Sequence, residues 1–138
     1  RAGEQGGRVP AASAGIVPGN PARLDWRALV AVLLQARRAG ASAEACALAF
    51  HRGLADGLAA LLRDVAGGER GPVLLTGGCF QNRLLAELCV EALQARGFTP
   101  LLPERFPPND GAIALGQLYG ALLSPAEGTV PQESLSCA

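Results

Sequence analysis

The sequence predicts an α/β domain in which short parallel strands pack against helices. Apolar residues recur with 3.6-residue spacing in four separate segments, which predicts four helices. Two apolar runs, residues 72–76 and 98–102, are too short for helices and are bounded by glycine or proline, so they predict strands. A helical segment lies between these runs, and this order favours a parallel pair joined by a right-handed crossover. Because the first run lacks alternation, we expect it to be a buried strand.

The chain divides into three regions by composition. Residues 1–21 hold five glycines and three prolines with little periodicity, so they predict a linker or loop. Residues 22–124 carry the predicted helices and strands. Residues 125–138 are polar and contain proline, which predicts a flexible tail.

The first two helices have recognisable ends. Asp25 is a candidate N-cap for a helix that ends at Gly40, and Ser42 is a candidate N-cap for a helix that Gly67 and Gly68 terminate. Gly53 and Gly57 lie inside the second helix, where glycine costs roughly 1 kcal/mol against alanine. Their four-residue spacing places them on one side, so we expect close packing there.

The last two helices follow the predicted strands. One extends from about Phe80 to Arg96, and the other begins at Asn109 or Asp110 and runs to Leu123. Two strands alone make a poor sheet, because at least three are needed for independent stability. The chain also contains no methionine, and we therefore expect it to be a piece of a larger domain.

Charge and cysteine usage exclude several functions. Lys and Arg number 12, and Asp and Glu also number 12, so neither nucleic acid nor an anionic membrane is an expected partner. The cysteines, Cys46, Cys79, Cys89 and Cys137, form no C-x-x-C pair, which predicts free thiols in a reducing cytoplasm.

A glycine pair follows the first predicted strand, in the order Leu75-Thr-Gly-Gly-Cys-Phe-Gln-Asn82. Gly77 and Gly78 let a backbone approach a ligand, and the helix that follows presents free N–H groups suited to phosphate. A plain tight turn would use the same glycines. Asn82 is expected in the first helical turn, where its amide either reaches a nucleotide or faces solvent.

A second motif, Pro107-Pro-Asn-Asp-Gly-Ala112, precedes the last helix. Asp110 is either an N-cap or a hard ligand for a metal ion, and the residues alone favour the cap. His51 is the only histidine, and a single helical histidine is more often packed or exposed than a ligand. One histidine and one aspartate fall short of a full coordination set.

The two motifs together resemble the C-terminal signatures of the HypF carbamoyltransferases, on residues 76–85 and 106–117. The stretches Leu24-Asp-Trp26 and Ala49-Phe-His51 also resemble the segment that precedes those signatures, so the resemblance covers about Arg23 to Leu123. Departures are mild: the family has Ser, Val and Gly where this chain has Thr76, Cys79 and Ala112.

This resemblance implies a partial actin-like ATPase lobe, the C-terminal lobe of a Kae1/TsaD-like carbamoyl-transfer domain, over residues 22–124. It implies that Gly77 and Gly78 cradle the phosphates of ATP, that Asn82 lies at the nucleotide site, and that Asp110 is a ligand of an iron or zinc ion. It assigns no catalytic residue within this chain. The family's H-x-x-x-H metal pair has no counterpart here, since the chain has one histidine.

The implied activity belongs to a complete enzyme. Such an enzyme uses carbamoyl phosphate and ATP, forms carbamoyl-adenylate, and carbamoylates the C-terminal cysteine of a HypE-like acceptor, which starts cyanide-ligand synthesis for [NiFe]-hydrogenases. The remainder of the HypF-like protein is thus an implied partner, and we expect the isolated chain to be inactive. A threonylcarbamoyl transferase of the TsaD type and a non-catalytic remnant acting as an interaction module are the alternatives.

Overall fold

The computed structural model describes residues 8–123, and the predicted tail at 125–138 lies outside this range. The elements follow in the order β1 (Gly15–Val17), β2 (Arg23–Asp25), α1 (Arg27–Arg38), α2 (Ala43–Val65), β3 (Pro72–Leu74), α3 (Arg83–Gln94), β4 (Thr99–Leu101) and α4 (Ile113–Leu123). Two short 3₁₀ helices, Gly78–Gln81 and Asp110–Ala112, precede α3 and α4. The mixed α/β class with short parallel strands and packed helices is thus confirmed.

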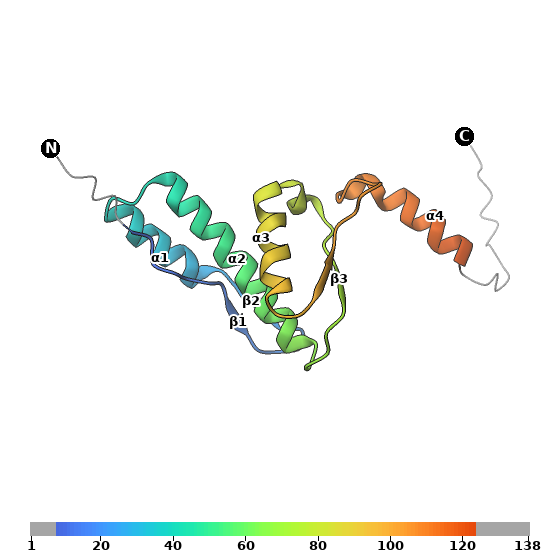
Figure 1. Ribbon diagram of the computed structural model, residues 1–138, viewed down its shortest axis with the longest axis horizontal. Helices are drawn as coiled ribbons and strands as arrows, with labels where there is room; N and C mark the ends of the chain where they lie inside the picture. Colours follow the sequence, from blue (N-terminus) through green and yellow to red (C-terminus); the bar gives the residue numbers. More distant parts are fainter. Residues whose placement is uncertain (1–7, 124–138) are drawn as a thin grey trace, which may run out of the picture.

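Helix α2 is the central element of the fold. Figure 1 shows α1 with the β1–β2 pair on one side of α2, and α3 with β3 on the other. By length and apolar composition alone α2 would suit a membrane span. However, it packs against both α1 and α3, and it carries Arg52 and Asp56 near its middle.

Ser42 caps α2 as expected, because its hydroxyl accepts the backbone N–H of Ala45 at 3.1 Å. The start of α1 differs from expectation, since Trp26 and not Asp25 occupies the N-cap position. Asp25 still accepts the backbone N–H of Arg27 at 3.0 Å and pairs with its guanidinium. These bonds from Arg27 lower the pKa of Asp25 to about 2.

The expectation of a linker or loop over residues 1–21 is wrong at Gly15–Val17, which form strand β1. Strand β1 pairs with β2 in an antiparallel register that places Ile16 opposite Leu24. Ala14 is buried against α2, and a Cβ added to Gly57 would lie 2.8 Å from the Ala14 carbonyl oxygen. A Cβ on Gly53 would lie 2.6 Å from the Ala12 carbonyl oxygen. Because Gly53 and Gly57 carry no side chain, this N-terminal segment packs directly against the backbone of α2, and Leu29 of α1 packs there beside Gly53.

Strands β3 and β4 pair in parallel, as the strand–helix–strand order predicted, with Val73 opposite Pro100. The expectation of a buried strand is wrong, since Pro72 and Leu74 are exposed and Val73 is only half-buried. The reason is physical: among the described residues this sheet has two strands, so one face has no covering layer.

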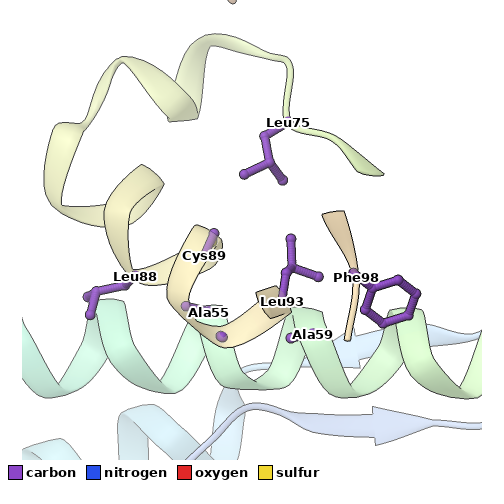
Figure 2. Close-up of a cluster of buried hydrophobic side chains, with 8 residues drawn as sticks. Ala55, Ala59, Leu75, Leu88, Cys89, Leu93 and Phe98 are labelled. Atoms are coloured by element: carbon purple, nitrogen blue, oxygen red, sulfur yellow. The ribbon is translucent and has the colours of Figure 1, made fainter. Parts of the chain in front are cut away.

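Within residues 8–123, two hydrophobic clusters form the core, one on each side of α2. The cluster between α2, α3 and the parallel strands contains Leu75, Leu93 and Phe98, and Figure 2 shows these side chains converging above Ala55 and Ala59 of α2. The small alanines of α2 let α3 approach closely. The second cluster contains Ala14, Leu29 and Leu33.

Helix α4 projects away from the rest of the molecule in Figure 1. The sequence pattern gives it an apolar stripe, yet each apolar side chain of that stripe is exposed, with Leu118 at 65% and Leu122 at 83%. Burial of these side chains would require a surface other than residues 8–123.

Candidate functional site

The carboxyl ends of β3 and β4 lie at the same edge of the parallel pair. Leu75 continues the pairing, because its N–H donates to the Leu101 carbonyl oxygen at 2.9 Å. The loop after β3 contains the glycine pair, and the loop after β4 contains the Pro-Pro-Asn-Asp motif. In α/β folds the carboxyl edge of parallel strands is the usual place for a ligand.

Backbone hydrogen bonds join these two loops directly. The Pro108 carbonyl oxygen accepts the backbone N–H of Gly77, and it also accepts the Thr76 hydroxyl at 3.2 Å. A Cβ added to Gly78 would lie 3.9 Å from the Asn109 Cβ. The structure thus brings together two motifs that are about thirty residues apart in sequence.

The two glycines of the first loop have different roles. Gly77 has φ 110° and ψ 152°, a backbone region that is almost confined to glycine. Gly78 has an ordinary φ, and a Cβ added there would make only ordinary van der Waals contact. The Gly77 N–H is already bonded to Pro108, whereas within residues 8–123 the N–H groups of Gly78 and Cys79 have no acceptor. Gly77 shapes the loop, and the next two residues offer donors.

Asn82 occupies the N-cap of α3 and is not in the first helical turn, which corrects the expected position. A 3₁₀ helix intervenes, so α3 begins at Arg83 and not at Phe80. The Asn82 Oδ1 atom accepts the backbone N–H of Leu85 at 3.2 Å, and its Nδ2 atom lies 2.9 Å from Nε2 of His51. Asn82 is exposed, but both ends of its amide are engaged.

Asp110 is not the cap of the last helical segment. Asn109 takes that position, with its Oδ1 atom accepting the Gly111 N–H at 3.0 Å. The Asp110 carboxylate is exposed and makes no hydrogen bond or ion pair within residues 8–123. In the same part of the chain no three His, Cys, Asp or Glu side chains come together as a metal site. A metal ion bound by Asp110 would therefore need ligands from outside residues 8–123.

Two cysteines lie close to the glycine loop. Cys79 is exposed within the loop, and Cys89 is buried beneath it in α3. Burial is the main cause that raises the pKa of the Cys89 thiol to about 11, and the nearby Cys79 adds to the effect. Cys89 is thus a core residue and not a nucleophile at neutral pH.

A groove of about 600 Å³ adjoins the joined loops. Its walls come from the 3₁₀ helix before α3, from α3 and from the segment after β4, and they include Phe80, Gln81, Arg83, Leu102 and Pro108. A larger hollow of about 910 Å³ lies elsewhere, between the N-terminal segment and α2, and contains no residue of either motif.

Sequence reasoning missed two residues of this site. The sequence pattern gives His51 no role beyond packing or exposure, whereas in the structure this residue of α2 is hydrogen-bonded to Asn82. Thr76 stands out in the sequence only as a departure from a family pattern, although its hydroxyl binds the second loop. Both contacts span about thirty residues, so no local spacing could have predicted them. The one feature of the sequence that could have drawn attention to His51 is that it is the only histidine.

Comparison with known proteins gives a consistent result. The family model described as "Carbamoyltransferase, Kae1-like Domain, second subdomain" matches residues 5–117. The chain is 40% identical over 134 residues to carbamoyltransferase HypF of Rhizobium leguminosarum bv. viciae, covering 95% of this chain and 17% of that protein. It is 40% identical over 99 residues to carbamoyltransferase HypF of Synechocystis sp., covering 72% and 12% respectively.

A third relative, the carbamoyltransferase HypF homolog of Cupriavidus necator, is 37% identical over 116 residues, covering 81% of this chain and 29% of that protein. The chain therefore spans 12 to 29% of the length of these relatives. No solved structure gives a significant match.

Proposed function

Because the chain belongs to the HypF carbamoyltransferase family, in the second subdomain of its Kae1-like domain, we propose that it forms one wall of a carbamoyl-transfer site. The rest of the site would come from sequence outside this chain. The single observation that carries the proposal is the direct bonding of the two signature loops through Pro108, Thr76 and Gly77. This bonding places both signatures at the carboxyl edge of the strands.

The complete enzyme would take the carbamoyl group of carbamoyl phosphate and activate it with ATP as carbamoyl-adenylate. The acceptor would be the C-terminal cysteine of a HypE-like protein in the cytoplasm, as the first step toward the cyanide ligands of [NiFe]-hydrogenases. In the transfer, the cysteine thiolate attacks the carbamoyl carbon, a C–S bond forms, and AMP leaves with the electrons of the broken C–O bond.

This chain would contribute one lobe of an actin-like ATPase fold, with ATP bound between it and a second lobe. The N–H groups of Gly78 and Cys79, which have no acceptor within residues 8–123, are suited to phosphate oxygens. Gly77 would hold the loop in the required conformation. Asn82 would add a side-chain donor at the start of α3.

Asp110 would bind the iron or zinc ion of the complete domain. Its carboxylate is exposed and does not cap the helix, which suits a ligand in a metal site that residues outside this chain complete. A bound cation would supply positive charge beside the transferring group. Further ligands would come from outside this chain, since residues 8–123 hold no group of three His, Cys, Asp or Glu side chains that could bind the ion.

The test is a Gly78→Val substitution in the complete protein, with ATP affinity measured by calorimetry. A branched side chain at this position would keep phosphate oxygens away from the backbone donors, and we expect at least tenfold weaker binding, about 1.4 kcal/mol. Gly71→Val is the matched control, because Gly71 also has an ordinary φ and room for a Cβ but precedes β3.

Equal ATP affinity in the wild-type and Gly78→Val proteins would show that this loop does not bind the phosphates of ATP. A wild-type protein that binds neither ATP nor carbamoyl phosphate would instead support the remnant that acts only as an interaction module.

A further inference from the structure

A chain of hydrogen bonds links the middle of α2 to the start of α3. The Leu85 N–H donates to Asn82 Oδ1 at 3.2 Å. Asn82 Nδ2 lies 2.9 Å from His51 Nε2, and His51 Nδ1 lies 2.7 Å from the carbonyl oxygen of Ala47. His51 is one turn after Ala47 on α2, so the chain crosses from one helix to the next through two side chains.

In this series of hydrogen bonds, the donor at one bond fixes which atom is the donor at the next. A backbone N–H only donates, so the oxygen of the Asn82 amide must face Leu85 and its nitrogen must face His51. An amide nitrogen also only donates, so Nε2 of His51 must accept. The ring proton is then on Nδ1, where the Ala47 carbonyl oxygen accepts it. Each hydrogen bond is consistent with the next, which assigns both the amide orientation and the histidine tautomer.

We propose that His51 is the positioning residue for Asn82, and that Asn82 thereby presents one amide N–H to an oxygen of the bound nucleotide. This inference rests on the proposed function of the loop. Of the two Nδ2 hydrogens, one is used by His51, and the second has no acceptor within residues 8–123. His51 acts through Asn82 and does not itself contact the nucleotide.

The geometry explains why a second contact is needed. The cap to Leu85 holds only the amide oxygen, and an asparagine side chain held at one atom still rotates about its χ angles. The bond from Nδ2 to His51 holds the other end, so the remaining N–H has one direction. Because His51 is half-buried and its ring packs edge-on against Phe50, with centroids 5.9 Å apart, the acceptor is itself held in place.

A residue with only a packing role would behave differently from a positioning residue under substitution. His51→Phe keeps an aromatic ring of similar shape and removes the acceptor. His51→Gln removes the ring and keeps an acceptor oxygen at about the same distance from the backbone. A packing role predicts that Phe is tolerated better than Gln, whereas the positioning role predicts that Gln restores what Phe loses.

The experiment measures ATP affinity in the complete protein for the wild type, His51→Phe, His51→Gln, Asn82→Ala and the double variant His51→Phe/Asn82→Ala. We expect Phe to weaken ATP binding roughly three- to tenfold, as for the loss of one hydrogen bond. Gln should remain within about threefold of the wild type. The Phe substitution should have no further effect once Asn82 is Ala, since the two residues act as one unit.

Asn82→Asp tests the proposal independently of His51, because it preserves the cap of α3 and removes the side-chain donor. It should fold and bind ATP more weakly even if His51→Phe fails to fold. Wild-type affinity in His51→Phe or in Asn82→Asp would overturn the proposal. The proposal would also be overturned if His51→Phe lowered ATP affinity by the same factor in the wild-type background and in the Asn82→Ala background.

A separate readout distinguishes this inference from the proposed function. Hydrogen exchange at the start of α3, residues 82–88, should be faster in His51→Phe than in His51→Gln. If the wild-type protein does not bind ATP, the proposed function fails while this exchange difference still demonstrates the His51–Asn82 link. If ATP binds and neither affinity nor exchange distinguishes Phe from Gln, the positioning role is wrong and the proposed function stands.

Discussion

Gly77 donates its backbone N–H to the carbonyl oxygen of Pro108, and this bond closes the loop after β3 onto the loop after β4. The bond forms with Gly77 at φ 110° and ψ 152°, where a side chain is strained. The local backbone of one signature therefore depends on a carbonyl group from the other.

Gly77→Ala should destabilise the protein by about 1–3 kcal/mol, because alanine rarely adopts this backbone conformation. Gly78→Ala should cost far less, since a Cβ there meets only the Asn109 Cβ at 3.9 Å. Urea unfolding of both variants measures the difference. Equal free energies of unfolding would mean that the loop rearranges without strain.

Asp110→Asn should fold normally, because Asn109 and not Asp110 supplies the cap. In the complete protein this substitution should lower bound iron or zinc and abolish carbamoyl transfer, since a charged hard ligand is lost. Metal analysis by mass spectrometry measures the first effect. Asn109→Asp is the control, because it keeps the cap and should keep the metal. A fully loaded Asp110→Asn protein would exclude Asp110 as a ligand.

Gly53→Ala should destabilise by roughly 1–3 kcal/mol, as overpacking does in a filled core. The added Cβ would lie 2.6 Å from the Ala12 carbonyl oxygen and 2.7 Å from Leu29 Cδ1. Gly116→Ala in α4 is the matched control. Nothing lies within 4 Å of that position, so the same change should stabilise by about 0.5–1 kcal/mol through helix propensity. Thermal unfolding of the two variants should therefore shift in opposite directions.

Cys79 should react with a thiol reagent much faster than Cys89, because Cys79 is exposed and Cys89 is buried with its pKa raised from 9.0 to about 11. The raised pKa also has a consequence for stability. Folding favours the neutral thiol, so this contribution is complete below about pH 9 and is lost as pH rises toward 11. Cys89→Ser should reduce that alkaline loss. Mass spectrometry of labelled peptides measures the rates, and equal rates would contradict the burial of Cys89.

The isolated chain should associate or bind apolar dyes, because α4 presents an uncovered apolar surface. Leu118→Lys and Leu122→Lys should improve solubility with little change in stability, since these side chains are 65% and 83% exposed. Leu93→Lys, at a fully buried position, should prevent folding. Light scattering and circular dichroism measure the two properties. A monomer with a sharp, reversible transition and no dye binding would contradict this expectation.

Local signals predict much of the fold. The position of Ser42 before an apolar periodic run indicates a cap, and Gly67 and Gly68 indicate the end of α2. The parallel pairing of β3 and β4 follows from the helix between them. Each of these predictions depends on residues that are close in sequence or on a general rule of chain connection.

Contacts between distant segments were not predictable in this way. Strand β1 has three residues, too few to show alternation, although Pro18-Gly-Asn-Pro21 after the apolar pair Ile16-Val17 was a usable turn signal. The 3₁₀ helix before α3 moves Asn82 from the first turn to the cap. The identity of the cap at Asn109 required the actual backbone, because Asn and Asp cap about equally well.

The packing of residues 12–14 against Gly53 and Gly57 of α2 determines where this subdomain can be cut. A chain shortened to begin at residue 22 would lose β1 and the buried Ala14. It would also leave the backbone surface of Gly53 and Gly57 open to water and remove part of the cover over Leu29 and Leu33. For expression or for domain exchange between relatives, the N-terminal boundary therefore belongs before Val9, which of the described residues is the first to pack against this cluster.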